Sequence, residues 1–207
     1  MTHTPIPTFP LALTVMLGPQ ILVAILLITR KDPIKSSLVY IASIVLTLIA
    51  TTLMYYMLVD ITHFQDTTLG GRPMLKYVIV AFIVFLIIKL IANRHKATKP
   101  PKWMKSISTA SLRRIFIIGF SLIAFMPADI VAAFSVGSLL NNNPKGFWAA
   151  LPFFGAVTLI AATPLIFYTL LGKKGPAYLK KVNEWLNTHG YVINIIVLLF
   201  FIYLLLY

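Results

Sequence analysis

The chain has no cysteine and few acidic residues. Its 207 residues contain five Asp and Glu together, against 18 Lys and Arg. The absence of cysteine excludes thiol–disulfide chemistry and thiolate metal sites, including the paired-cysteine electron transfer of some small six-helix membrane proteins. The four histidines do not have the spacing of metal ligands, so we expect no metal site; they are His3, His63, His95 and His189.

Signatures of nucleotide-dependent and hydrolytic enzymes are also missing. The sequence has no Gly-rich phosphate loop, no nucleophile elbow and no paired carboxylates. Residues 1–10 carry no Lys or Arg, which a cleavable signal requires, so we expect the first apolar run to be retained as a helix. We predict a protein that is not an enzyme and needs no cofactor.

Apolar residues dominate what is present. They make up 59% of the chain, and charged residues only 11%, whereas soluble domains average about 45–50% and about 25%. Because the run Tyr77–Ile88 does not alternate as a barrel strand would, the sequence predicts an all-α integral membrane protein. Six runs are long enough to cross the membrane as helices; they cover approximately 9–29, 36–59, 75–92, 112–139, 147–171 and 190–207.

The basic residues lie mainly between these runs. Fourteen of them fall on one side of the predicted bundle, and only Arg72, Lys76 and Lys145 fall on the other. The positive-inside rule therefore places the richer side in the cytoplasm and both termini outside. This placement favours anionic lipid headgroups as partners and argues against nucleic acid.

One segment, 176–189, is too polar to span. Its apolar residues recur on one helical face, Pro176 suits a helix start and Gly190 suits a stop. We expect a short amphipathic helix on the cytoplasmic surface. A helix packed against the bundle without lipid contact is the alternative, because periodicity does not separate the two.

The two halves of the sequence resemble each other. Thr47–Leu53 matches Thr158–Pro164, Tyr77–Ile79 matches Tyr191–Ile193, and the first and fourth runs align at an offset of 108. Because each half holds three helices, the second half enters the membrane from the opposite side, as in the inverted repeats of secondary transporters. We predict a first three-helix repeat in residues 1–92, a basic cytoplasmic loop in 93–111 and a second repeat in 112–207.

Prolines interrupt the first helix of each half. Pro19 and Pro127 occupy matching positions, and Pro164, beside Thr163, predicts a third break. Proline removes an intrahelical hydrogen bond and kinks the helix, and transporters place their sites at such breaks. Packing alone is the alternative reading for any single proline.

Asp129 is the strongest candidate for a functional side chain. It is the only acid well inside an apolar run, two residues after Pro127, and Gln20 lies at the matching depth after Pro19. An ionised carboxylate in hydrocarbon is costly, so Asp129 either takes up a proton or meets a cation. A structural Asp that accepts backbone hydrogen bonds at the break is the alternative.

Four further residues are candidates for binding. Thr163 is a substrate contact, unless its hydroxyl bonds its own helix. Lys89 lies within the third run, where it either joins the site, as a partner of Asp129, or extends to the interface. Arg113 and Arg114 begin the fourth run, where they either bind phosphate or carboxylate headgroups or anchor the topology.

Three segments carry a resemblance to a known family: Leu17–Ile21, Phe125–Asp129, and Leu171–Lys174 continuing through Glu184–Asn187. With the six-helix layout, they resemble the lysine exporter superfamily, and within it most closely the peptidoglycolipid- or sulfolipid-addressing (GAP-like) family. The resemblance implies export of amino acids and other small cations for the superfamily, and movement of glycolipids to the cell surface for that branch. Relatives carry a basic residue and Asn where this chain has Ala128 and Asp129, which leaves the charge of the substrate open.

Together with the resemblance, these features predict a multi-pass secondary transporter of the bacterial plasma membrane that exports or flips a lipid-linked or glycolipid substrate, with proton coupling as one option. Two alternatives stay open: an exporter of a small amino acid or cation, and a non-transporting scaffold for an envelope-synthesis enzyme. The expected partners are membrane lipids with anionic headgroups and a lipid or small-molecule substrate. A homodimer is left open.

Overall fold

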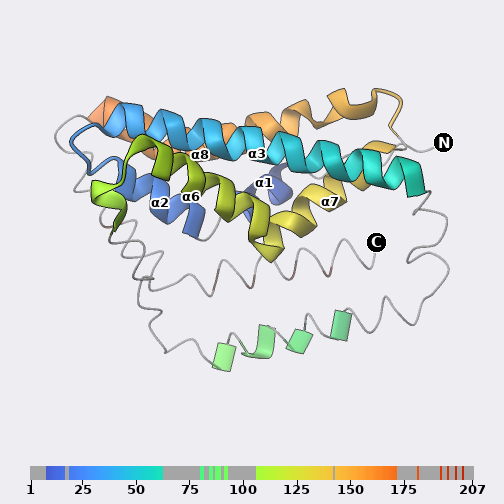
Figure 1. Cartoon of the computed structure of the whole chain (residues 1–207). Coiled ribbons are helices and arrows are strands. Elements are labelled where there is room, and N and C mark those ends of the chain that lie inside the picture. Colours follow the sequence, from blue (N-terminus) through green and yellow to red (C-terminus); the bar gives the residue numbers. More distant parts are fainter. Residues whose placement is uncertain are drawn as a thin grey trace.

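The computed structural model describes residues 8–16, 19–62, 106–141 and 143–171, with isolated positions between 80 and 92 and between 181 and 202. Within these ranges the regular elements are helices, as predicted (Figure 1). They are α1 (Thr8–Met16), α2 (Pro19–Leu27), α3 (Pro33–Thr62), the 3₁₀ turn η2 (Ser106–Thr109), α6 (Leu112–Phe125), α7 (Pro127–Asn141), the 3₁₀ turn η3 (Gly146–Ala150) and α8 (Leu151–Leu171).

Two helices are each long and apolar enough to cross a membrane. These are α3 and, together with η3, α8. The 30 residues of α3 extend about 45 Å at 1.5 Å per residue, more than the hydrocarbon thickness. Large apolar side chains such as Leu46 on α3 and Leu159 on α8 are exposed, as expected for helices that face lipid chains. The protein is therefore embedded in a membrane.

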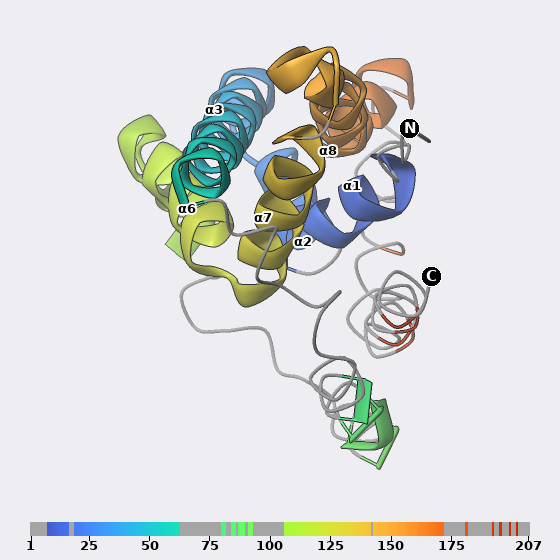
Figure 2. The ribbon, with the colours of Figure 1, turned by 90° about the vertical axis from the view of Figure 1, so that its right-hand side faces the viewer.

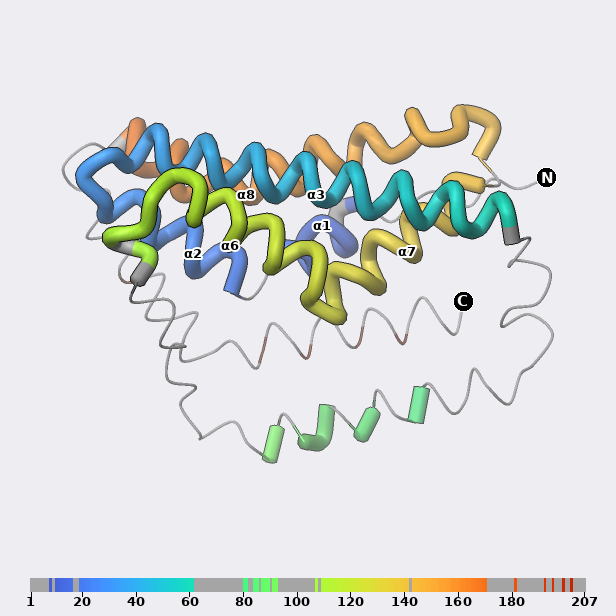
Figure 3. Tube along the Cα trace, viewed as in Figure 1, coloured from blue at the N-terminus to red at the C-terminus, as the bar shows by residue number. Residues whose placement is uncertain are grey.

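The other two predicted runs in the described residues form bent helix pairs. The helix axis bends by 64° between α1 and α2 and by 67° between α6 and α7. Up to four spans are therefore present if each bent pair counts as one span. Figure 3 shows the turn from α6 into α7. The predicted runs 75–92 and 190–207 and the amphipathic segment 176–189 lie almost entirely outside the described residues, and six spans remain a prediction.

The described helices repeat one order, a bent pair followed by a long helix. Each bent pair packs against the long helix of the other half: α1 and α2 against α8, and α6 and α7 against α3 (Figure 2). The inverted repeat itself stays a prediction, because most of the predicted third run of each half, 75–92 and 190–207, lies outside the described residues.

The core is a continuous apolar cluster between the packed helices. Leu11 and Val15 of α1, Ile44 of α3, Val136 of α7 and Phe153 of α8 are among its fully buried members. Glycines allow the helices to approach closely, as is common in membrane bundles. A Cβ on Gly137 of α7 would lie 2.9 Å from the backbone nitrogen of Tyr56 and 3.1 Å from the carbonyl oxygen of Thr52 on α3.

Gly137→Ala is expected to destabilise the protein by about 1–3 kcal/mol, because the clash is with backbone that has to move as a whole. Gly155→Ala is the matched control, since a Cβ there meets nothing within 4 Å. Thermal unfolding in detergent compares the two variants with the wild type. Equal unfolding temperatures for both variants would contradict the close packing of α7 on α3.

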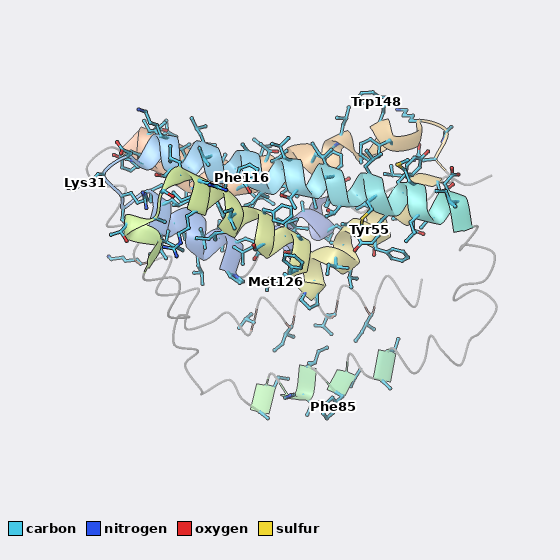
Figure 4. The ribbon with its side chains drawn as sticks, in the orientation of Figure 1. Lys31, Tyr55, Phe85, Phe116, Met126 and Trp148 are labelled. Atoms are coloured by element: carbon cyan, nitrogen blue, oxygen red, sulfur yellow. The ribbon has the colours of Figure 1, made fainter. Side chains whose placement is uncertain are left out.

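The two ends of the bundle differ in character. At one end lie the exposed cations Lys31, Lys35, Arg113 and Arg114, which we call the basic end. At the other end Tyr56 packs on Phe147, and Trp148 of η3 is 72% exposed (Figure 4). Aromatic side chains of this kind gather at membrane interfaces, and cations favour the cytoplasmic side.

The predicted break at Pro164 is wrong. Pro164 lies inside α8, which continues from Leu151 to Leu171 without interruption. A proline inside a helix removes one hydrogen bond, and in membrane helices the surroundings compensate for that loss. Pro19 and Pro127 differ because each occupies the first position of a new helix, where no intrahelical donor is needed.

Candidate functional site

The break between α6 and α7 is a single extended residue. Met126 has φ −79° and ψ 124°, the conformation that a following proline favours. Its amide donates to the carbonyl of Leu122 at 3.2 Å, and its carbonyl accepts the amides of Asp129 and Ile130, each at 3.0 Å. Met126 therefore ends α6 and begins α7, which places Asp129 in the first turn of α7.

The two polar residues beside the prolines are in direct contact. Gln20 Nε2 donates to Asp129 Oδ2 at 2.5 Å and also lies 3.3 Å from Met126 Sδ. Gln20 and Asp129 are each 1% exposed. The contact joins α2 to α7, and therefore the first bent pair to the second. The structure thus brings Pro19, Gln20, Pro127 and Asp129 together, which the sequence placed only at matching depths.

One side-chain oxygen of each residue in this pair lacks a hydrogen-bond donor among the described residues. Gln20 Oε1 and Asp129 Oδ1 are buried and have no hydrogen-bond partner among the described residues. A buried polar atom without a partner costs about 1–3 kcal/mol. Orphaned acceptors of this kind in a native fold indicate a functional role or a bound partner, and they make the Gln20–Asp129 pair the candidate site.

Tyr40 supports the pair from α3, a role that the sequence analysis missed. Its side chain is fully buried, and its hydroxyl donates to the backbone carbonyl of Gln20 at 2.9 Å. Gly119 of α6 packs beside it: a Cβ there would lie 3.2 Å from the Tyr40 ring. The spacing of Ser36, Tyr40, Ser43 and Thr47, at intervals of three and four residues, is the signal that marks this polar stripe on α3.

Thr163 is not joined to the pair by any hydrogen bond of the described residues. Its hydroxyl donates to the carbonyl of Leu159 in its own helix at 2.9 Å. Lys89 is exposed at one of the isolated described positions. Arg113 and Arg114 are exposed in the first turn of α6, where the amide of Arg114 donates to the capping Ser111 Oγ at 3.3 Å. In the described ranges, no three His, Cys, Asp or Glu side chains gather as metal ligands.

Arg30 is a second residue that the sequence analysis did not single out. It follows α2, and its guanidinium donates to Ser36 Oγ at 2.9 Å, to the carbonyl of Ala110 at 2.7 Å and to the carbonyl of Ile107. Ile107 and Ala110 are buried. Arg30 therefore ties the end of α2 to the η2 turn that leads into α6, and this contact places the loop before α3 beside the start of the second half.

Three comparisons place the chain among known proteins. No curated protein and no solved structure matches the chain. One family model matches residues 9–207, which is nearly the whole chain and includes every helix described above except the first residue of α1. That family is described as Sap, sulfolipid-1-addressing protein, and it agrees with the branch that the sequence resembles. By this match, the chain belongs to the sulfolipid-1-addressing protein family.

Proposed function

We propose that the protein is a secondary transporter that exports or flips a lipid-linked or glycolipid substrate across the bacterial plasma membrane. The observation that carries the proposal is the buried Gln20–Asp129 contact, which joins two proline-started helices from different halves of the chain. Sites at the junction of interrupted helices are typical of secondary transporters. The name of the family, which refers to a sulfolipid, supports a lipid substrate.

In this proposal the third and sixth helices complete two inverted halves, with both termini outside. The two states are open to either side of the membrane and differ in the angles at the breaks before Pro19 and Pro127. Hinges of this kind confine a large change to a few backbone dihedral angles. Thr163 and Lys89 are proposed to meet the substrate in one of these states.

The basic end is proposed to hold anionic headgroups on the cytoplasmic side. Arg113 and Arg114 begin α6, although cations at a helix N-terminus oppose the helix dipole. Helix stability therefore does not explain their position, whereas attraction to phosphate, sulfate or carboxylate groups does. The loop before α3, which belongs to the basic end, contains one exposed acid, Asp32, between Lys31 and Lys35.

Purified protein in liposomes tests the proposal directly. Vesicles that contain a fluorescent anionic glycolipid in one leaflet are expected to show translocation that protein-free vesicles lack, and neutralising Arg113 and Arg114 together is expected to slow it. The headgroup prediction is checked by measuring the translocation rate again in vesicles whose other lipids are all zwitterionic. Vesicles that translocate no lipid at any protein density would contradict the proposal.

Export of a small amino acid or cation is the second candidate. It is favoured by Asp129 Oδ1, which has no hydrogen-bond partner within the described ranges and is an acceptor that an ammonium group would satisfy. The same vesicles, loaded with radiolabelled lysine instead of labelled lipid, separate the two candidates. Efflux of the amino acid without lipid movement would favour this second function.

A further inference from the structure

We propose that Gln20 and Asp129 bind one proton between them, and that this proton fastens the first bent helix pair to the second. The inference rests on the proposed function, for which it names the coupling ion. The bound form is a carboxylic acid paired with an amide. The proton sits on Asp129 Oδ1, and the new O–H group donates to Gln20 Oε1 while Gln20 Nε2 continues to donate to Asp129 Oδ2.

The two atoms of the pair that lack hydrogen-bond partners in the described part of the chain are the two that this proton would join. Gln20 Oε1 and Asp129 Oδ1 belong to planar groups that already share one hydrogen bond, and both residues are 1% exposed. As long as Asp129 is a carboxylate, both oxygens are acceptors, and neither has a donor among the described residues. Protonation turns one of them into a donor for the other, so that a single proton satisfies both.

The orientation of the amide is determined by its neighbours. Gln20 Nε2 faces both Asp129 Oδ2 and Met126 Sδ, and both of these atoms are acceptors. Rotating the amide by half a turn would place Oε1 against these two acceptors and lose both contacts. Oε1 is therefore the atom left without a donor, and the hydroxyl of Tyr40 holds the backbone of the same residue in place.

The charges around Asp129 favour a proton over other cations. α1, α2, η3 and α8 contain no charged residue, and α6 and α3 carry theirs at exposed positions near their ends, as Arg113 and Arg114, and as Lys35 and Asp60. Tyr40 of α3 is fully buried and contacts the pair through the backbone carbonyl of Gln20, while Tyr55 of α3 packs against Phe134 of α7. Hard metal cations take about six or more oxygen ligands, whereas the pair has three side-chain oxygens, of which Asp129 Oδ2 already accepts from Gln20 Nε2.

Loss of the proton would release the contact. It would leave a buried charge held by a single amide and two oxygens without donors, so the deprotonated pair favours separation of α2 from α7 or entry of water. Proton binding and the relative position of the two bent pairs are thereby linked. Whether the substrate or the proton binds first depends on which of the two transport states exposes the Gln20–Asp129 pair.

Infrared spectroscopy of the full-length protein in nanodiscs tests the inference without any transport. The carbonyl stretch of a protonated carboxylic acid is expected at neutral pH and is expected to disappear as the pH is raised. It should be lost in Asp129→Asn and retained in Asp60→Asn, a matched control because Asp60 is exposed on α3. In Gln20→Leu the band should move to higher frequency, since its hydrogen bond to the amide is gone.

A band missing from the wild type at neutral pH would overturn the inference, as would a band that survives Asp129→Asn or one that Gln20→Leu leaves in place. Gln20→Asn, which keeps an amide on a shorter side chain and should also shift the band, serves if Gln20→Leu does not fold. The liposome assay of lipid translocation tests the transport proposal independently of the infrared band. An Asp129 band with the expected behaviour in a protein that moves no lipid would retain the proton site and reject the transport proposal.

Discussion

Vesicles that contain the Asp129→Asn protein are expected to translocate lipid about ten- to a hundredfold more slowly than wild-type vesicles. Asn has the shape of Asp and still accepts from Gln20 Nε2, so the fold is expected to survive. It cannot lose a proton, so it never creates the unsatisfied buried oxygens that release the contact; such an atom costs about 1–3 kcal/mol, which corresponds to about one to two powers of ten in rate. Initial rates at matched protein density provide the measurement.

Asp60→Asn is the control for this substitution. Asp60 lies near the far end of α3 and is exposed, so its replacement removes one carboxylate without touching the pair. Its translocation rate should equal that of the wild type. If Asp129→Asn were as active as Asp60→Asn, Asp129 would be a structural residue at the helix break, and the role of the pair in transport would be refuted.

Arg30→Gln is expected to have the largest effect on stability, about 2–4 kcal/mol. The substitution removes a charged donor from three acceptors, two of which are the carbonyls of the buried residues Ile107 and Ala110. A buried carbonyl that loses its donor costs about 1–3 kcal/mol. Denaturant unfolding in detergent, followed by circular dichroism, measures the loss.

Two further variants determine whether the geometry of Arg30 or its charge is responsible. Lys31→Gln removes a neighbouring exposed cation and should leave the unfolding midpoint unchanged. Arg30→Lys keeps the charge but lacks the planar fork that reaches several acceptors, so it should recover only part of the stability. Full recovery by lysine would show that the guanidinium contacts with Ile107 and Ala110 contribute little.

The helix breaks were predictable from the sequence, and the contact between them was not. Pro19 and Pro127 mark both bends because proline acts locally, on its own helix. The hydrogen bond from Gln20 to Asp129 depends on how two bent pairs dock, which no single run of residues specifies. The sequence therefore placed two polar side chains at similar depths and left their pairing undetermined.

The wrong prediction at Pro164 and the two missed residues have the same origin, because all three depend on contacts between distant parts of the chain. Pro164 carries the same local signal as Pro127, yet its helix continues, because neighbouring groups in the fold decide whether one lost hydrogen bond ends a helix. Arg30 was counted among the loop cations that determine orientation, and nothing in its position along the chain reveals the distant carbonyls of η2. Tyr40 was missed for a similar reason, since its partner is a backbone atom of another helix.

The single-residue turn at Met126 has a consequence for the solvent around the protein. Pro127 has no amide hydrogen, and the amide of Asp129 is taken by Met126, so the carbonyls of Ile123 and Phe125 lose the donors that an unbroken helix would supply. Phe125 is 72% exposed, and a bare peptide carbonyl is not stable against lipid tails. At the depth where α6 gives way to α7, this flank of the molecule is therefore expected to lie against water or another stretch of polypeptide and not against lipid tails.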